Sequence, residues 1–116
     1  MKPEKILQIV SDYFEMPKHT MTHRCNRDEV IKAKHIAIYF ICRFTTMKSF
    51  DIGEMFGYSD RSAVTHAFKS VSKQRQFSFE YRHDVNEIEK LIEESEVVYY
   101  DEFQENDFYT LEETKR

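Results

Sequence analysis

The sequence has few of the residues that interrupt helices and build β turns. Its 116 residues include only two glycines and two prolines, and no tryptophan. A β sandwich or barrel needs turns rich in Gly and Pro at short intervals. This scarcity therefore favours a helical protein. The length allows one domain with a hydrophobic core and is too short for two domains of ordinary size.

Cysteines and long apolar runs are equally scarce. The two cysteines, Cys25 and Cys42, are too few for a disulfide framework. No run of 18 apolar residues occurs, so the sequence predicts no membrane-spanning helix. The first residues lead into a charged amphipathic segment, which differs from the apolar region of a signal peptide. Together these features predict a cytoplasmic protein that does not associate with a membrane.

The charges divide the chain into two unequal parts. Residues 1–83 carry 14 Lys and Arg against 9 Asp and Glu, a net charge of +5. Residues 84–116 carry 3 Lys and Arg against 12 Asp and Glu, a net charge of -9. A basic body with an acidic tail indicates a polyanion as the partner of the body.

Apolar residues recur at helical spacing through most of the body. The pattern predicts helices over about residues 3–16, 27–44, 50–56, 60–75 and 80–94, with a connecting loop at 18–24. From Ile36 to Phe44 the second helix is apolar on nearly all sides, so we expect it to be central and buried. In the last helix the expected core positions are Val85, Ile88, Leu91 and Ile92.

The ends of the predicted helices carry suitable capping residues. Asn26 followed by Glu29 resembles a capping box at the start of the central helix. Gly57 stands where a glycine often ends a helix. The expected N-caps of the two helices on either side of this glycine are Ser49 and either Ser59 or Asp60.

The two helices around Gly57 predict a helix-turn-helix, because a short glycine-containing turn joins them. The face of the second helix opposite its apolar stripe carries Arg61, Ser62, Thr65, Lys69, Ser72 and Lys73. Arginine and short hydroxyl side chains at a helix start suit base edges in a major groove, and free N–H groups there suit a phosphate. The two lysines suit the DNA backbone. A merely solvated polar face is the alternative on periodicity alone.

Three segments resemble the C-terminal DNA-binding domain of the bacterial replication initiator DnaA. They are residues 34–40 (KHIAIYF), 49–57 (SFDIGEMFG) and 60–67 (DRSAVTHA), and their order and spacing match that family without gaps. The likeness covers about residues 4–92. It implies an all-α helical bundle of the Trp-repressor-like type, with a helix-turn-helix, that binds double-stranded DNA in sequence-specific fashion. It implies a function in replication initiation or its regulation.

The resemblance also implies roles for individual residues. By position Lys34 would enter the minor groove, while Asp60, Arg61, Ser62 and Thr65 would face bases or phosphates of the major groove. Tyr58 and Ser59 stand where the family has Gly and Arg, so one strong DNA contact is replaced by Ser59. Because a bidentate arginine prefers guanine, Arg61 in place of the family's His predicts a changed target sequence.

Chemistry other than DNA binding finds little support in the sequence. His19, His23 and Cys25 lie close together, but without the spacing of a zinc site. No orienting group accompanies a cysteine–histidine pair, so we expect no catalytic residue, metal or cofactor. No Walker A loop is present, which predicts a stand-alone domain without the initiator's ATPase, of the kind a phage or mobile element carries.

We therefore expect a DnaA-like domain over residues 1–96 and an acidic, aromatic tail over 97–116. The sequence leaves three alternatives for the structure of the tail, which are a short strand, a docked arm and a disordered end. Tyr99–Tyr109 could fold back on the basic helix and compete with DNA, or dock a protein partner. The rival function for the domain is a protein-interaction adaptor with weakened DNA contacts, which could bind a replication protein. The sequence does not indicate an oligomeric state.

Overall fold

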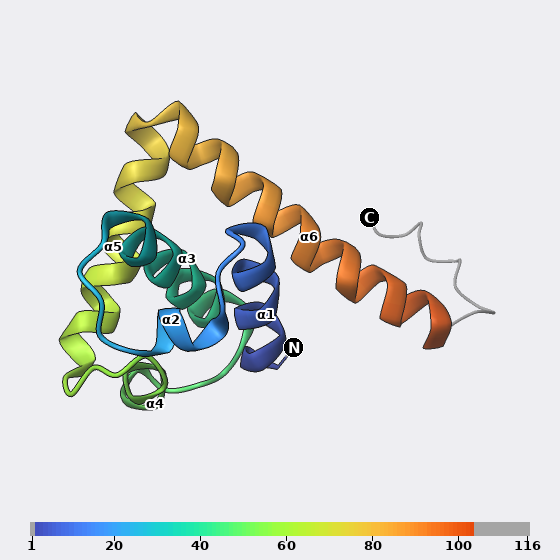
Figure 1. The fold of residues 1–116 in the computed structure, drawn as a ribbon. Coiled ribbons are helices and arrows are strands. Elements are labelled where there is room, and N and C mark those ends of the chain that lie inside the picture. The colour runs from blue at the N-terminus through green and yellow to red at the C-terminus, as the bar shows by residue number, and fades with distance from the viewer. Residues whose placement is uncertain (1, 104–116) are drawn as a thin grey trace.

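The computed structural model of the protein describes residues 2–103, with side chains up to Ser95. The described helices are α1 (Pro3–Tyr13), α2 (Lys18–Thr22), α3 (Asp28–Phe44), α4 (Ser49–Met55), α5 (Arg61–Phe77) and α6 (Phe79–Phe103). They form a bundle around α3, with α6 lying across α5 and α1 (Figure 1). Residues 2–103 contain no strand, which confirms the predicted all-α helical bundle.

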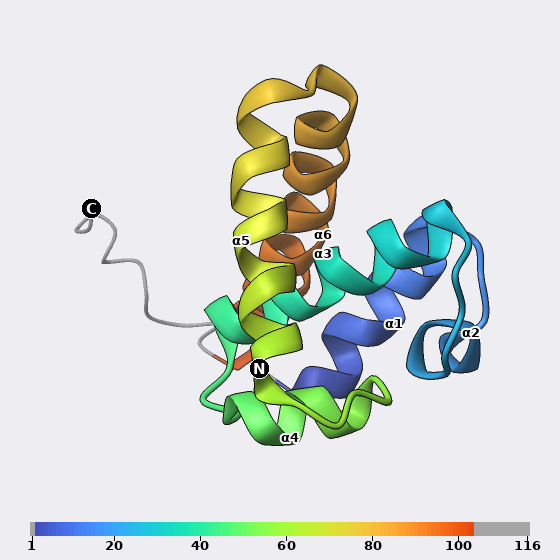
Figure 2. The same ribbon diagram turned by 90° about the vertical axis from the view of Figure 1, so that its left-hand side faces the viewer.

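Helix α3 is the centre of the bundle, as its apolar sequence predicts. It packs against α1, α2, α4 and α5. Its residues from Ile36 to Ile41 are all buried, because neighbouring helices cover every side of this stretch. Figure 2, a view from the side, shows α3 passing between α5 and α1. Burial of each large apolar side chain contributes about 1.5–3 kcal/mol, so α3 supplies much of the driving force for folding.

The prediction of a loop at residues 18–24 is wrong, because α2 occupies Lys18–Thr22. Pro17 is the residue before the helix, where its fixed φ and missing N–H do no harm. Met21 is fully buried against the core. A five-residue helix has too few positions to show a periodic pattern, so this single apolar residue was the only signal for it.

Two of the predicted N-caps are also wrong. Helix α3 begins at Asp28 after Arg27, and neither Asn26 nor any other side chain caps it by a hydrogen bond. Helix α4 begins at Ser49 itself after Lys48, again without a side-chain cap. Acidic residues in the first turn, Asp28 and Glu29 in α3, stabilise the helix start through the helix dipole.

Polar contacts fix α6 against the rest of the bundle. The carboxylate of Asp84 accepts hydrogen bonds from Lys32 Nζ (2.7 Å) and Tyr13 Oη (2.8 Å). Farther along, Arg43 pairs with Glu89 at 3.3 Å. These contacts join α6 to both α1 and α3.

The sequence did not predict the length and burial of α6 correctly. The helix continues to Phe103, past the expected end at Glu94, so the first residues of the expected tail have a helical backbone. The remainder, 104–116, lies outside the described residues. Val85, Ile88 and Ile92 are buried as predicted, whereas Leu91 is 41% exposed. No described helix is both long and apolar enough to cross a membrane.

Candidate nucleic-acid interface

Helices α4 and α5 pack against each other and are joined by a turn built on Gly57. The φ of Gly57 is +81°, a conformation that side chains disfavour. The N–H of Tyr58 donates to the carbonyl of Gly53 (2.8 Å), and the N–H of Gly57 to that of Glu54 (3.1 Å). This pair of bonds is the Schellman motif, which ends α4 and turns the chain toward α5. The predicted glycine end is confirmed.

Asp60 caps the start of α5, as one of the two predicted alternatives. Its Oδ1 accepts a hydrogen bond from the N–H of Ser62 at 2.8 Å. This bond lowers the pKa of the Asp60 carboxyl, because it stabilises the charged form. The N–H of Ala63 also has a partner, the Asp60 carbonyl at 3.2 Å. We expected the N–H groups at the start of α5 to be free to bind a phosphate. For Ser62 and Ala63 this expectation is wrong, because both N–H groups already have partners.

The residues of α5 that were predicted to bind DNA form one exposed face. Val64, Ala67 and Val71 are buried on the opposite side and fix the rotation of the helix. The exposed face begins with Ser59 and Asp60 in the turn and continues along the helix through Arg61, Ser62, Thr65, Lys69 and Lys73. Seven of the eight residues predicted to bind DNA thus lie together. We call these seven residues the recognition face.

Lys34, the eighth predicted residue, does not lie on the recognition face. Its side chain is only 3% exposed, and Nζ donates a hydrogen bond to the carbonyl of His23 at 3.0 Å. The ammonium also lies over the Tyr58 ring, 5.2 Å from its centroid. Burial lowers the pKa of Lys34, because it removes water from the charged form. In this conformation the Lys34 ammonium contacts the His23 carbonyl and the Tyr58 ring, and its role in DNA binding stays a prediction.

Tyr58 belongs to the turn and is half-buried against the hydrophobic core. These contacts show Tyr58 covering the hydrophobic seam between the turn and the core. Burial raises the pKa of its hydroxyl. The ring thus covers both the core and the ammonium of Lys34, in a position where glycine would cover neither.

A pair of histidines at the back of α5 was not predicted. The rings of His35 on α3 and His66 on α5 lie edge to face, with centroids 5.9 Å apart. Burial lowers the pKa of His35, and the nearby His66 and Lys34 lower it further. His66 remains exposed but supports the packing of α5 on α3 through this contact. Residues 31 apart in sequence give no periodic signal for such a pair.

Cys25 and Cys42 are both free thiols. Within the part of the chain that the structure describes, no three His, Cys, Asp or Glu side chains lie close enough to hold a metal ion.

Two packed helices, a glycine turn and an exposed polar face on the second helix define a helix-turn-helix domain. A family model described as the bacterial dnaA protein helix-turn-helix matches residues 3–71. The chain belongs to this family. The match covers α1 to α4 completely and ends within α5.

Individual relatives agree with this assignment. The chain is similar to the chromosomal replication initiator protein DnaA of Bacteroides thetaiotaomicron, with 29% identity over 89 residues, which are 77% of this chain and 19% of that protein. The corresponding protein of Bacteroides fragilis is 27% identical over 81% of this chain and 20% of its own length. That of Spiroplasma citri is 34% identical over 78% and 20%. The chain thus spans about a fifth of the length of the curated relatives it matches.

Proposed function

We propose that the protein binds double-stranded DNA in a sequence-specific manner, with α5 as its recognition helix. The observation that carries the proposal is the recognition face. Arg61, Thr65 and Lys69 follow one another at intervals of four residues, all exposed, on a helix whose other side is buried. Membership of the DnaA helix-turn-helix family supports DNA binding related to replication initiation.

The chemistry of each residue suggests its role in the complex. The guanidinium of Arg61 can contact a guanine edge in bidentate fashion. Ser62 and Thr65 have short hydroxyl side chains, which allow close approach to bases or phosphates. Lys69 and Lys73 lie farther from the start of the helix, where they would neutralise backbone phosphates. Asp60 caps the helix and so fixes its start, and the exposed hydroxyl of Ser59 beside it can contact a phosphate.

Lys34 reaches the DNA in this proposal only after leaving its present contacts. The hydrogen bond to the His23 carbonyl and the contact with Tyr58 would both have to break. Binding through the recognition face therefore comes first, and insertion of Lys34 into a minor groove adds to it. The contact between Lys34 and the minor groove would then require a change in the conformation of this side chain, because it is not preformed.

The experiment that tests the function is selection of bound duplexes from a random-sequence pool with the full chain at physiological salt. Enrichment of a motif of several base pairs would support sequence-specific binding. A matched selection with Arg61→Ala and Lys69→Ala together keeps the fold but removes two proposed contacts, so it should lose the motif. Binding without any enriched motif would overturn the specificity and leave only general affinity for DNA.

The second candidate function is an adaptor that binds a replication protein. The burial of Lys34 favours it, since one expected DNA contact is unavailable in this conformation. The two functions differ in their salt dependence. DNA binding loses about one log unit of affinity per phosphate contact for each log unit of salt. If no duplex binds at any salt concentration, the adaptor becomes the better proposal.

We also propose that residues 1–96 suffice for DNA binding and that the acidic residues 97–116, which begin within α6, have a function of their own. Deletion of residues 97–116 tests both this division and competition of the tail with DNA. Competition predicts that the shortened chain binds more tightly and with a different salt dependence. Unchanged affinity and salt dependence would exclude competition, and an unfolded product would exclude the division of the chain at residue 96.

A role on chromosomal DNA would place the protein in the cytoplasm. The proposed function includes no catalytic step.

A further inference from the structure

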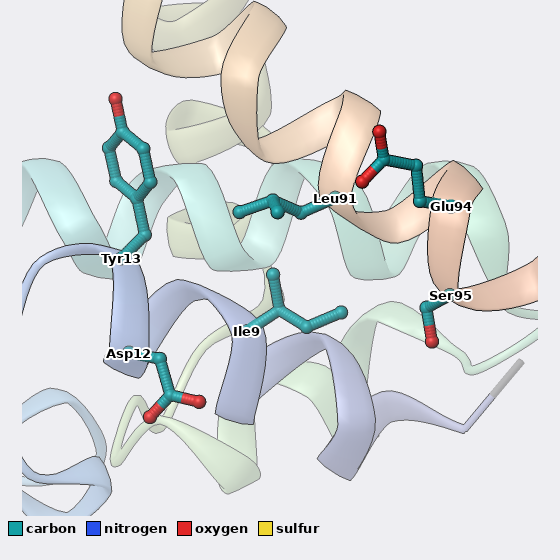
Figure 3. Close-up of a pocket in the computed structure, with 6 residues that line it drawn as sticks. All are labelled: Ile9, Asp12, Tyr13, Leu91, Glu94 and Ser95. Carbon is teal, nitrogen blue, oxygen red and sulfur yellow. The ribbon is translucent and has the colours of Figure 1, made fainter.

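A groove lies between α1 and α6, away from the recognition face. Its volume is about 480 Å³, and it is lined by Ile9, Asp12, Tyr13, Leu91, Glu94 and Ser95. Figure 3 shows Ile9 and Leu91 from the two helices on either side of the space, with Asp12 and Glu94 farther out. The groove therefore has an apolar floor and carboxylates at its edges.

The composition of the groove defines what it can bind. Leu91 occupies a core position in the helical pattern, yet it is 41% exposed because nothing in the described chain covers it. The lining includes two carboxylates, Asp12 and Glu94, and no basic residue. The complementary surface is an apolar side chain flanked by basic residues.

The corner between α5 and α6 has this composition. Phe77 and Phe79 are 75% and 78% exposed on the two sides of Ser78. Lys73 lies one helical turn before Phe77, and Arg82 lies one turn after Phe79. Between these two basic residues the only carboxylate is that of Glu80. We call Phe77, Ser78 and Phe79 the aromatic corner.

The aromatic corner is held in place by its basic neighbour. Arg82 donates from Nε to the carbonyl of Arg75 (2.9 Å) and from Nη2 to the carbonyl of Gln76 (3.2 Å). These carbonyls belong to the last turn of α5, so the bonds both end that helix and fix the guanidinium at the corner. The two phenylalanines thus project from a rigid support with positive charge beside them.

A chain cannot insert its own corner into its own groove. Phe79 and Leu91 lie on the same helix, 12 residues apart, which separates them by about 18 Å along the axis. Figure 1 shows the corner at one end of α6 and the segment facing α1 farther along it. The aromatic corner of a chain therefore does not fill the groove of that same chain.

We propose that the aromatic corner of one copy docks into the α1–α6 groove of a second copy. The apolar rings cover Ile9 and Leu91, and Arg82 beside the aromatic corner faces Asp12 and Glu94. Two different surfaces meet in such a contact, so each copy keeps a free corner or a free groove, and copies add head to tail. The start of α5, with Arg61 and Thr65, lies at the opposite end of that helix from the corner and stays available to DNA.

The test uses two variants of the full chain in the absence of DNA. The corner variant carries Phe77→Ser and Phe79→Ser, and the groove variant carries Leu91→Lys. All three positions are exposed, so both variants should keep the helical circular dichroism of the native protein. Analytical ultracentrifugation of the native protein should show assembly beyond the dimer as concentration rises, with weaker assembly at high salt.

Mixing the variants gives the decisive result. Each variant alone should remain monomeric at concentrations where the native protein assembles. An equimolar mixture should form a complex of two chains and nothing larger, because only one intact corner and one intact groove remain to meet. A monomeric native protein, assembly of either variant alone, or a mixture that stays monomeric would overturn the proposal. Duplex binding by the variants measures the proposed DNA function separately, since both retain the recognition face.

Discussion

The ammonium of Lys34 lies 5.2 Å from the centre of the Tyr58 ring and donates a hydrogen bond to the carbonyl of His23. Lys34 is at the start of the central part of α3, and Tyr58 is in the turn of the helix-turn-helix. The resemblance to DnaA aligns Lys34 with a minor-groove arginine and Tyr58 with a glycine. The tyrosine thus covers the one basic residue that the family pattern assigns to the minor groove.

Replacing this ring should release the lysine. We expect Tyr58→Gly to raise affinity for duplex DNA by up to about thirtyfold, because the cation–π contact of a desolvated ammonium contributes up to about 2 kcal/mol. The measurement is fluorescence anisotropy with the selected duplex. Tyr58→Phe keeps the ring and should bind like the native protein. Equal gains in both variants, or a loss in the glycine variant with its fold intact, would show that the ring does not restrain Lys34.

Arg61 and Lys69 should contribute in different ways to DNA binding. Arg61→Ala removes a proposed base contact, so it should cost about 1–3 kcal/mol on the preferred site and relax selection at one base pair. Lys69→Ala removes a proposed phosphate contact and should weaken all duplexes alike, with a smaller salt slope. Titration of a small set of single-base variants of the site measures both effects. Identical behaviour of the two variants on every duplex would contradict α5 as the recognition helix.

The two glycines should respond oppositely to alanine. At Gly57 a Cβ would lie 3.2 Å from the carbonyl oxygen of Thr22, and φ is positive, so Gly57→Ala should destabilise the domain by about 1–2 kcal/mol. At Gly53, inside α4, the nearest atom would be Val64 Cγ2 at 3.5 Å, an ordinary contact. Gly53→Ala should therefore stabilise by about 0.5–1 kcal/mol. Urea unfolding of both variants compares them directly, and equal shifts would contradict this account of the turn.

The parts of the fold that follow from local sequence were predictable. The burial of α3 from Ile36 onward and the Gly57 turn both depend on residues close together in the chain. The recognition face follows from the same periodicity, because burial of Val64 and Val71 leaves Arg61 and Thr65 outside. Contacts between distant segments were not predictable in this way. Lys34 was expected at a DNA surface, but its burial depends on the His23 carbonyl and on Tyr58 from two other segments.

Leu91 illustrates the same limit within a correctly predicted helix. Its spacing from Ile88 and Ile92 indicates the core, but Leu91 lines the groove between α1 and α6 and is 41% exposed. Helix α2 escaped prediction because five residues are too few to show a period. Local pattern therefore determined which helices form here, and packing geometry determined which side chains they expose.

Asp84 should be the polar residue on which the position of α6 depends most. It accepts hydrogen bonds from Lys32 and Tyr13, which hold its pKa below the ordinary value despite partial burial, and burial together with this bond raises the pKa of Tyr13 to about 12. Asp84→Ala should lower the free energy of unfolding by about 1–3 kcal/mol. Glu93→Ala removes the same charge from an exposed position of α6 and should change it by less than about 0.5 kcal/mol. If both variants lose a similar amount of unfolding free energy, the loss comes from the change in net charge and not from the Asp84 hydrogen bonds.

The histidine pair should make stability depend on pH. The pKa of His35 lies below its ordinary value of 6.5, because burial, His66 and Lys34 all disfavour its charged form. Between the lowered pKa and 6.5 the unfolded chain therefore binds more protons than the folded one, so the free energy of unfolding falls as pH decreases through this window. Above 6.5 this contribution is constant. Urea unfolding across the window measures it, and His35→Gln, which cannot titrate, should lose the pH dependence. If His35→Gln keeps the native dependence of the unfolding free energy on pH, that dependence comes from another histidine.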